Sequence, residues 1–228
     1  MGATYNAMYL DIVDPWINWQ WLSTHIPLLS DALTQHITLT VIAVGGGLVI
    51  SLPIGFAAHR YPFLRNPVLT TAGIFYTIPS LALFAFLIPY TGLTVLTAEI
   101  GLVSYTVLIL IRNIVVGLES VPPEVLDAAD GMGYRPFARL IRIELPIALP
   151  AIIAGVRIAT VTTIGLVTIT ALIGLGGLGS LIYKGLIENF HTPLVLGTIL
   201  SIVLALIADL SLAAAQRLAV PWSRGYAT

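Results

Sequence analysis

The chain has 228 residues and no cysteine, and 10 Lys and Arg against 11 Asp and Glu give it a formal net charge of −1. Apolar residues make up 57% and charged residues only 9%, whereas soluble domains carry about 25% charged residues. With a mean hydropathy of +0.97, this composition predicts an integral membrane protein. Three classes of protein are excluded. A nucleic-acid binder needs an excess of basic residues, a disulfide-stapled secreted domain needs cysteines, and an ordinary soluble enzyme needs more charged residues.

Five windows are long and apolar enough to cross a membrane as helices, since a span needs about 20 apolar residues. They are residues 37–58, 68–88, 98–118, 147–173 and 194–218. Their apolar runs are continuous rather than alternating, which favours helices over the strands of a β-barrel. The predicted fold is an all-α integral membrane protein of about five transmembrane helices.

Basic residues gather on one side of the predicted membrane. That side holds Arg60, Arg65, Arg135, Arg139, Arg142, Arg217 and Arg224, and the other side holds only Lys184. Because Lys and Arg accumulate in cytoplasmic loops, we expect the N-terminus outside and the C-terminus in the cytoplasm of a multi-pass protein of the cell (inner) membrane. Trp222 falls just past the fifth window, where the inner interface is expected.

The residues before the first window contain Trp16, Trp19 and Trp21 but no Lys or Arg. A cleaved signal peptide begins with a basic region, so none is expected here. Because Trp prefers the membrane interface, residues 16–33 are predicted to lie along the outer face, with a tail carrying a few anchors as the alternative. The predicted division is an outer segment 1–36, a transmembrane domain 37–218 and a cytoplasmic tail 219–228.

The cytoplasmic segment 119–146 carries much of the charge of the chain. Pro122 and Pro123 pre-set the backbone for the start of a helix. Glu124 and Asp127 then lie one turn apart near the positive end of the helix dipole. A short helix with an acidic first half is therefore predicted.

A turn and a second helix are predicted to follow. Gly131 or Gly133 can supply the left-handed residue that ends the first helix. Residues 135–143 form a second short helical pattern, which Leu145-Pro146 is expected to stop. The segment is thus predicted to form a helix–turn–helix elbow on the cytoplasmic face.

The spacing of residues in this elbow carries a family resemblance. The fixed positions are Asp127, Ala128, Ala129, Gly133, Ile143, Leu145 and Pro146. They resemble the "EAA" signature of permease subunits from binding-protein-dependent ABC importers, although Asp127 stands where that family usually has Glu. The resemblance implies a coupling helix that docks in a groove of a cytoplasmic ATPase. The implied coupling residues are Glu124, Asp127, Ala128, Ala129, Gly133, Arg135, Ile143, Leu145 and Pro146.

Four further stretches are similar to the glycine betaine/carnitine/choline permeases: residues 77–83, 112–113, 173–179 and 208–210. The resemblance implies the pathway-forming, non-enzymatic subunit of an importer for osmoprotectants, with no cofactor in this chain because ATP and Mg²⁺ bind the ATPase. Implied partners are two ATPase subunits, an extracytoplasmic binding protein and a second permease copy or paralogue. Methionine or another small polar solute is the alternative substrate.

Two stretches are candidates for the transport pathway. Pro79 removes a backbone donor in the second window and predicts a kink, which in a transporter can line the pathway. The glycine-rich run after the fourth window matches a dinucleotide fingerprint only formally, since an apolar span rather than a strand precedes it. A gate and a plain turn both fit this run. The candidates are Tyr76, Pro79, Ser80, Gly174, Gly176, Gly177 and Gly179.

Three charges, Arg112, Arg157 and Asp209, fall inside predicted spans, where charges are costly and usually paired. Asp209 is expected to pair with Arg157 or Arg112, and an ion-coupled secondary transporter is the alternative that would use them. The histidines His25, His36, His59 and His191 are expected at interfaces, and their spacing fits no metal site. Glycines 45–47 and Gly55 are expected to let helices approach closely.

Overall fold

The computed structural model describes residues 15–221, and these residues form helices joined by short turns, without a strand among them. Trp222 and Arg224, which the sequence assigns to the inner side, lie outside the described residues. The helices are α2 (Trp19–Thr24), α3 (Ile26–Arg60), α4 (Pro62–Thr77), α5 (Ser80–Thr91), α6 (Val95–Glu119), α7 (Pro123–Gly131), α8 (Pro136–Arg139), α9 (Leu145–Ile169), α10 (Leu178–Glu188) and α11 (His191–Ala219), with a π-helix at Leu140–Glu144 and a 3₁₀ turn at Thr170–Ile173.

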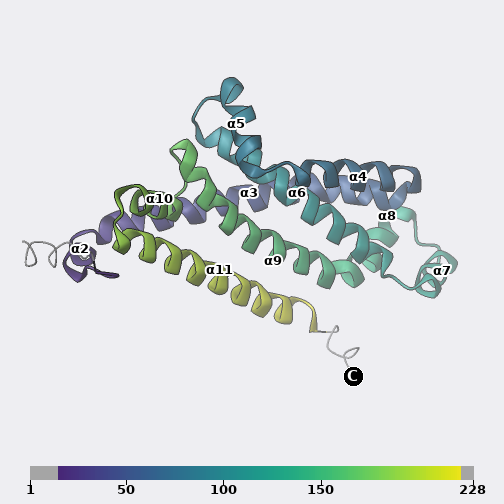
Figure 1. Ribbon diagram of the computed structural model, residues 1–228. Helices are drawn as coiled ribbons and strands as arrows, with labels where there is room; N and C mark the ends of the chain where they lie inside the picture. Colours follow the sequence, from purple (N-terminus) through teal and green to yellow (C-terminus); the bar gives the residue numbers. More distant parts are fainter. Residues whose placement is uncertain (1–14, 222–228) are drawn as a thin grey trace, which may run out of the picture.

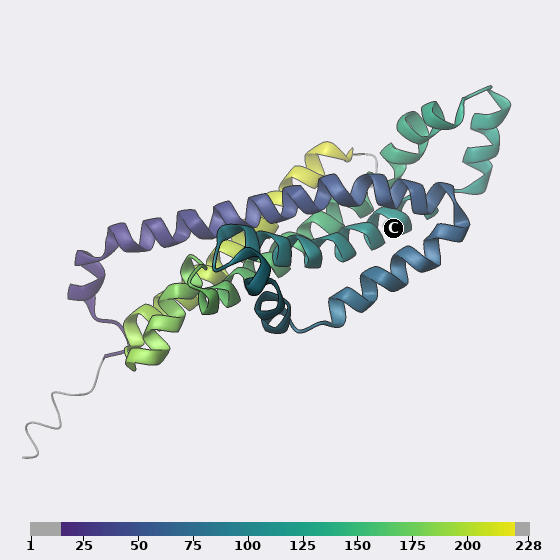
Figure 2. The ribbon, with the colours of Figure 1, turned by 90° about the horizontal axis from the view of Figure 1, so that it is seen from above.

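The long helices α3, α6, α9 and α11 run side by side as an elongated bundle (Figure 1). Helices α7 and α8 lie at one end, which we call the elbow end, and α2 and α10 lie at the other (Figures 1 and 2). Four helical segments are long and apolar enough to cross a membrane, or five if the bent pair α4–α5 counts as one span. The all-α membrane fold predicted from the sequence is confirmed.

Helix α3 begins earlier than the first apolar window. It starts at Ile26 with Pro27 in its first turn, so residues 26–33 belong to the spanning helix rather than to a separate segment on the outer face. At 35 residues it is about 50 Å long, which exceeds the ~30 Å apolar core of a bilayer. Before it, Asn18 caps α2, and its backbone N–H donates to Thr192 Oγ1 at 2.8 Å. The predicted boundary at residue 36 thus falls within a continuous helix.

The predicted kink at Pro79 is a complete break. Helices α4 and α5 meet at 92°, with Ile78 in extended conformation because the residue before a proline avoids the helical region. The hydroxyl of Tyr105 on α6 donates to the carbonyl of Ile78, which satisfies a backbone acceptor that the break leaves free. A partner on another helix therefore turns a proline kink into a right-angled corner.

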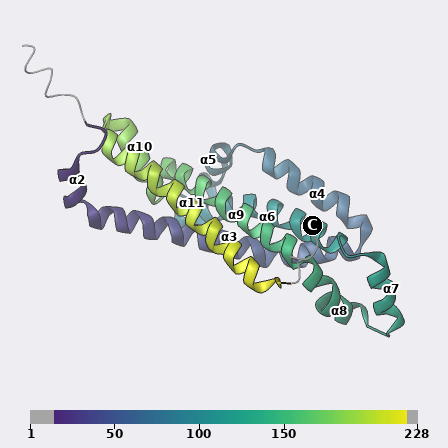
Figure 3. The same ribbon diagram turned by 90° about the horizontal axis from the view of Figure 1, so that it is seen from below.

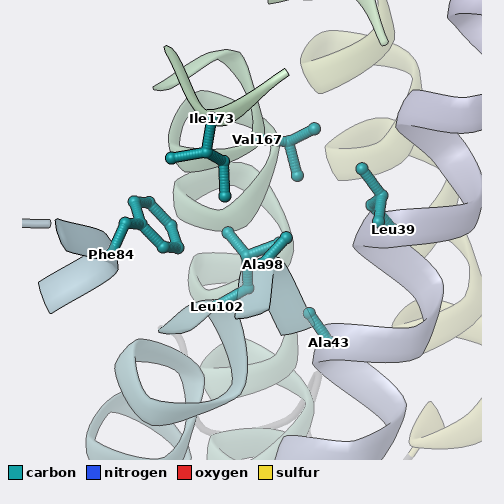
Figure 4. Packing of buried hydrophobic residues seen from close by; sticks show 7 residues of the cluster. All are labelled: Leu39, Ala43, Phe84, Ala98, Leu102, Val167 and Ile173. Carbon is teal, nitrogen blue, oxygen red and sulfur yellow. The ribbon is translucent and has the colours of Figure 1, made fainter. Parts of the chain in front are cut away.

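Helix α6 is the centre of the bundle. Near the α10 end it packs with α3, α5 and α9 in a cluster of Leu39, Ala43, Phe84, Ala98, Leu102, Val167 and Ile173 (Figure 4). Small residues bring the backbones together: a Cβ on Gly55 would lie 2.6 Å from Ile114, and one on Gly155 would lie 2.5 Å from Asn113. Close approach at small residues is how helices pack in membranes, as expected for Gly55.

The close contact of α3 with α6 is tested by replacing Gly47, with nearby Gly45 as the control. A Cβ there would lie 2.9 Å from Thr106 Cβ, whereas one on Gly45 would meet nothing within 4 Å. We expect Gly47→Ala to lower the stability of the purified protein by about 1–3 kcal/mol through overpacking, and Gly45→Ala to leave it unchanged or raise it slightly. Thermal unfolding in detergent measures both, and equal midpoints would contradict the close α3–α6 contact.

Candidate functional site

Helix α7 lies at the elbow end, off the bundle of long helices (Figure 3), and its acidic residues Glu124 and Asp127 are exposed. It starts at Pro123, with Pro122 as its N-cap residue and Glu124 in its first turn. Glu124, Asp127 and Ala128 are exposed, whereas Ala129 is buried. The side chains at i, i+3 and i+4 (Glu124, Asp127 and Ala128) therefore face outward, and the second alanine of the signature packs inward.

The turn after α7 depends on Gly133. Its φ of +79° is left-handed, as the sequence predicts for one of the two glycines, while Gly131 lies inside the helix. The Gly133 N–H donates to the carbonyl of Asp130 at 2.9 Å, and the Tyr134 N–H donates to that of Ala129 at 3.1 Å. This pair of bonds is the Schellman cap, which satisfies the last carbonyls of the helix and reverses the chain.

The second arm of the elbow does not stop at Leu145-Pro146, in contrast to the expectation. Helix α8, preceded by exposed Arg135, continues through the π-helix, which contains Ile143, into α9, so residues 136–173 form one apolar helical segment. A proline inside an α-helix clashes with the preceding turn, and the wider π turn before Pro146 relieves that clash. The arm is thus continuous with a transmembrane helix.

Two exposed apolar side chains flank the elbow turn and were not singled out from the sequence. Met132 is 68% exposed and Phe137 is 76% exposed. Met132 directly follows α7, and Phe137 lies on α8, so both belong to the elbow. Apolar residues within a charged loop were the sequence signal for them, because such residues mark a surface that a partner covers.

The pathway candidates gather in the half of the bundle opposite to the elbow. Tyr76, Pro79 and Ser80 flank the α4–α5 corner, where the rings of Tyr76 and Tyr105 lie 5.8 Å apart. The glycine-rich run joins α9 to α10 with positive φ at Gly174, Gly176 and Gly177. Phe84 of α5 and Ile173, directly before that run, share one buried cluster, so the two candidate groups adjoin the same core.

The glycine-rich run packs tightly against α3. Gly177 N–H donates to Gln35 Oε1 at 3.0 Å, and a Cβ on Gly177 would lie 2.5 Å from the carbonyl of Ala32. Gly179 is in equally close contact with the backbone at Thr168. Only glycine fits these positions.

Of the three charges within spans, two form a pair between α9 and α11. Arg157 Nε and Nη2 donate to the two carboxylate oxygens of Asp209, both at 2.9 Å. Arg112 on α6 is exposed and lies outside the ion pairs formed by residues 15–221. Asp209 thus takes the first of its two expected partners, in the bidentate geometry that makes Arg–carboxylate pairs strong.

Two histidines differ from the expectation of interfacial exposure. His36 is fully buried because α9 and the glycine-rich run pack against it, and its Nε2 donates to the carbonyl of Ile164 at 3.0 Å. His59 Nε2 donates to a carboxylate oxygen of Glu144 at 2.8 Å. Within residues 15–221 no group of three His, Cys, Asp or Glu side chains is placed to hold a metal ion.

A bundle of apolar helices with an exposed, capped elbow at one end fits the membrane subunit of a transport system. The chain belongs to the family of binding-protein-dependent transport system inner membrane components, whose model matches residues 32–219. It is therefore an inner-membrane permease subunit and not an enzyme, and it functions with an ATPase and a substrate-binding protein.

Characterised relatives match most of the chain. It is 37% identical to the osmoprotectant import permease protein OsmW of Salmonella typhimurium, covering 79% of this chain and 86% of the relative. It is 35% identical to the choline transport system permease protein OpuBB of Bacillus subtilis, covering 89% and 93%. The membrane fold is also similar to that of the inward-facing MetNI methionine ABC transporter, with a TM-score of 0.77 and 22% identity over 86% of this chain and 98% of that one.

Proposed function

We propose that this chain is the permease subunit of an importer for osmoprotectants of the glycine betaine, carnitine and choline class. The observation that carries the substrate class is its similarity to relatives named for such solutes, at 34–37% identity over 79–89% of the chain. Two copies, or one copy and a paralogue, would form the pathway along their interface. An extracytoplasmic binding protein would deliver the solute, and two ATPase subunits would drive its passage.

The exposed face of α7 is proposed as the docking surface for the ATPase. Glu124, Asp127 and Ala128 would contact the groove of the partner, and Met132 and Phe137 would add apolar area beside them. The remaining coupling residues would hold the elbow in shape: Ala129, Gly133, Arg135, Ile143, Leu145 and Pro146. Closure of the ATPase dimer on ATP would then displace the elbow as a lever and switch the pathway between two states.

The proposed orientation places the elbow end in the cytoplasm. Arg60, Arg65, Arg139, Arg142 and Arg217 lie on elements that end there, while Lys184 lies on α10 at the opposite end. This asymmetry matches the excess of basic residues on cytoplasmic sides. Residues 1–36 would then begin outside and residues 219–228 would end inside.

The proposed pathway runs beside the α4–α5 corner and the glycine-rich run. Tyr76, Pro79 and Ser80 are proposed to line it, and Gly174, Gly176, Gly177 and Gly179 to form a rigid outer turn against α3. The bidentate pair of Arg157 with Asp209 satisfies both charges, which supports a structural role rather than a proton relay for them.

Reconstitution in proteoliposomes tests this function. We expect uptake of a quaternary ammonium solute only when ATP is supplied to the ATPase and the binding protein is present, with methionine as the comparison solute. Saturable uptake of methionine but not of betaine, carnitine or choline would overturn the substrate class. Uptake driven by a proton gradient without ATP would overturn the importer and favour a secondary transporter.

A further inference from the structure

A chain of four polar side chains connects the elbow to the end of α3. Glu144, the last residue of the π-helix, is only 3% exposed. Its Oε1 accepts a hydrogen bond from Arg139 Nε at 2.9 Å, and its Oε2 accepts one from His59 Nε2 at 2.8 Å. Arg139 Nη1 in turn donates to Asp130 Oδ2, at the end of α7, at 2.6 Å. The chain thus passes from α7 through α8 and the π-helix to the last turn of α3.

The carboxylate of Glu144 is buried, so it depends on both of its hydrogen-bond donors. A buried carboxylate is costly unless its oxygens are paired, and each oxygen of Glu144 has one donor. The guanidinium of Arg139 is a planar fork that binds Glu144 and Asp130 through different nitrogens, so it fixes the angle between their helices. A shift of α7 would therefore strain the contact of Glu144 with α3 as well.

The π-helix is what brings Arg139 and Glu144 together. In an α-helix, residues five apart point in different directions, because one turn takes 3.6 residues. A π-helix bonds residue i to i+5, as the Leu145 N–H does to the carbonyl of Leu140, so residues five apart lie almost one turn apart. Local π turns are frequent at functional sites, and this one aligns the two charges.

Helix α7 otherwise stands off the bundle, as Figures 1 and 3 show. A cavity of about 610 Å³ separates the elbow from the end of α3, and its walls include Phe56 of α3 and Leu126 of α7. His59, Arg139 and Glu144 also line this cavity. The polar chain therefore bridges a space that the apolar side chains leave open.

We propose that Glu144 is the positioning residue of the elbow, which makes α3 follow the movement of α7. This inference rests on the proposed docking of α7 to the ATPase. With Glu144 paired on both sides, a displacement of α7 passes through Arg139 and Glu144 to His59 on α3 and, through the helix backbone, to α9. Without the two hydrogen bonds of Glu144, α7 can move at the Gly133 turn while the transmembrane helices stay in place.

The test is the amount of solute transported per ATP hydrolysed by the assembled transporter in proteoliposomes, with its ATPase and binding protein. In Glu144→Gln, which keeps the size of the side chain but removes its charge, we expect this ratio to fall about three- to tenfold, which lies within the effects of mutations along coupling elements. ATP hydrolysis per assembled complex should persist. A merely structural role would reduce the amount of assembled complex and leave the ratio unchanged.

Glu119→Gln is the matched control. Glu119 pairs with Arg65 at 2.7 Å at the same end of the bundle, but this pair is exposed and joins α4 to α6 rather than to the elbow. Its ratio should equal that of the wild type. If Glu144→Gln does not assemble, His59→Leu removes the link to α3 while Arg139 stays bound to Glu144, and the same fall is expected.

Three results separate the possible failures. A wild-type ratio in Glu144→Gln, or in His59→Leu where that variant replaces it, would overturn the positioning role alone. An equal fall in Glu119→Gln would also overturn the positioning role, because the loss of any carboxylate at this end would then lower the ratio. No ATP-driven uptake by the wild-type complex would overturn the proposed function and this inference with it.

Discussion

Asp127→Lys is expected to abolish ATP-driven uptake while the chain still inserts into the membrane. The side chain is exposed on the outer face of α7, so the change does not disturb the core of the bundle. It replaces a carboxylate by an ammonium within the proposed contact with the ATPase. Loss of one partner in a close charged contact costs about 2–5 kcal/mol, and each 1.4 kcal/mol is about tenfold in affinity.

Asp127→Glu provides the control. It keeps the charge, adds one methylene and restores the residue that the family usually has, so uptake near that of the wild type is expected. Uptake per inserted chain is compared for both variants, together with the thermal unfolding midpoint. Normal uptake by Asp127→Lys would contradict the assignment of α7 as the docking surface.

Gly133→Pro is the second change with a large expected effect, again a loss of transport with insertion retained. Proline fixes φ near −65°, whereas Gly133 has φ +79°, and proline also lacks the N–H that bonds to Asp130. The turn cannot keep its shape, because proline can neither adopt this φ nor donate this hydrogen bond. The elbow would then present α7 in the wrong orientation.

Gly131 supplies a matched control for this effect, two residues away. A Cβ meets nothing within 4 Å at either glycine, but only Gly133 has a positive φ. Gly133→Ala should therefore reduce transport in part, through a backbone cost of about 1–2 kcal/mol, and Gly131→Ala should be neutral or favourable to the helix. Equal transport by Gly133→Pro and Gly131→Ala would refute the role of the cap.

Long apolar runs and local turn chemistry made much of this architecture predictable. The windows locate the spanning helices because about 20 apolar residues in a row have few other stable arrangements. The start of α7 at the proline pair and its end at a left-handed glycine follow from the backbone preferences of those residues alone. Membership in the permease family likewise follows from spacing within one elbow.

Features that depend on distant partners were not predictable. The corner at Pro79 depends on Tyr105, which lies 27 residues beyond Ile78 and takes its carbonyl. His36 is buried against a carbonyl 128 residues away, and Glu144 meets His59 across 85 residues. The continuity of α8 with α9 was missed for another reason: a π turn accommodates Pro146, and composition carries no signal for such a turn.

Gentle solubilisation of the native complex through this subunit, followed by identification of its companions, tests the central claim most directly. The account predicts an ATPase with a phosphate-binding loop and an external solute-binding protein, and loss of the ATPase from the Asp127→Lys complex. Recovery of this chain alone, from a preparation shown to be intact and active in transport, would contradict it.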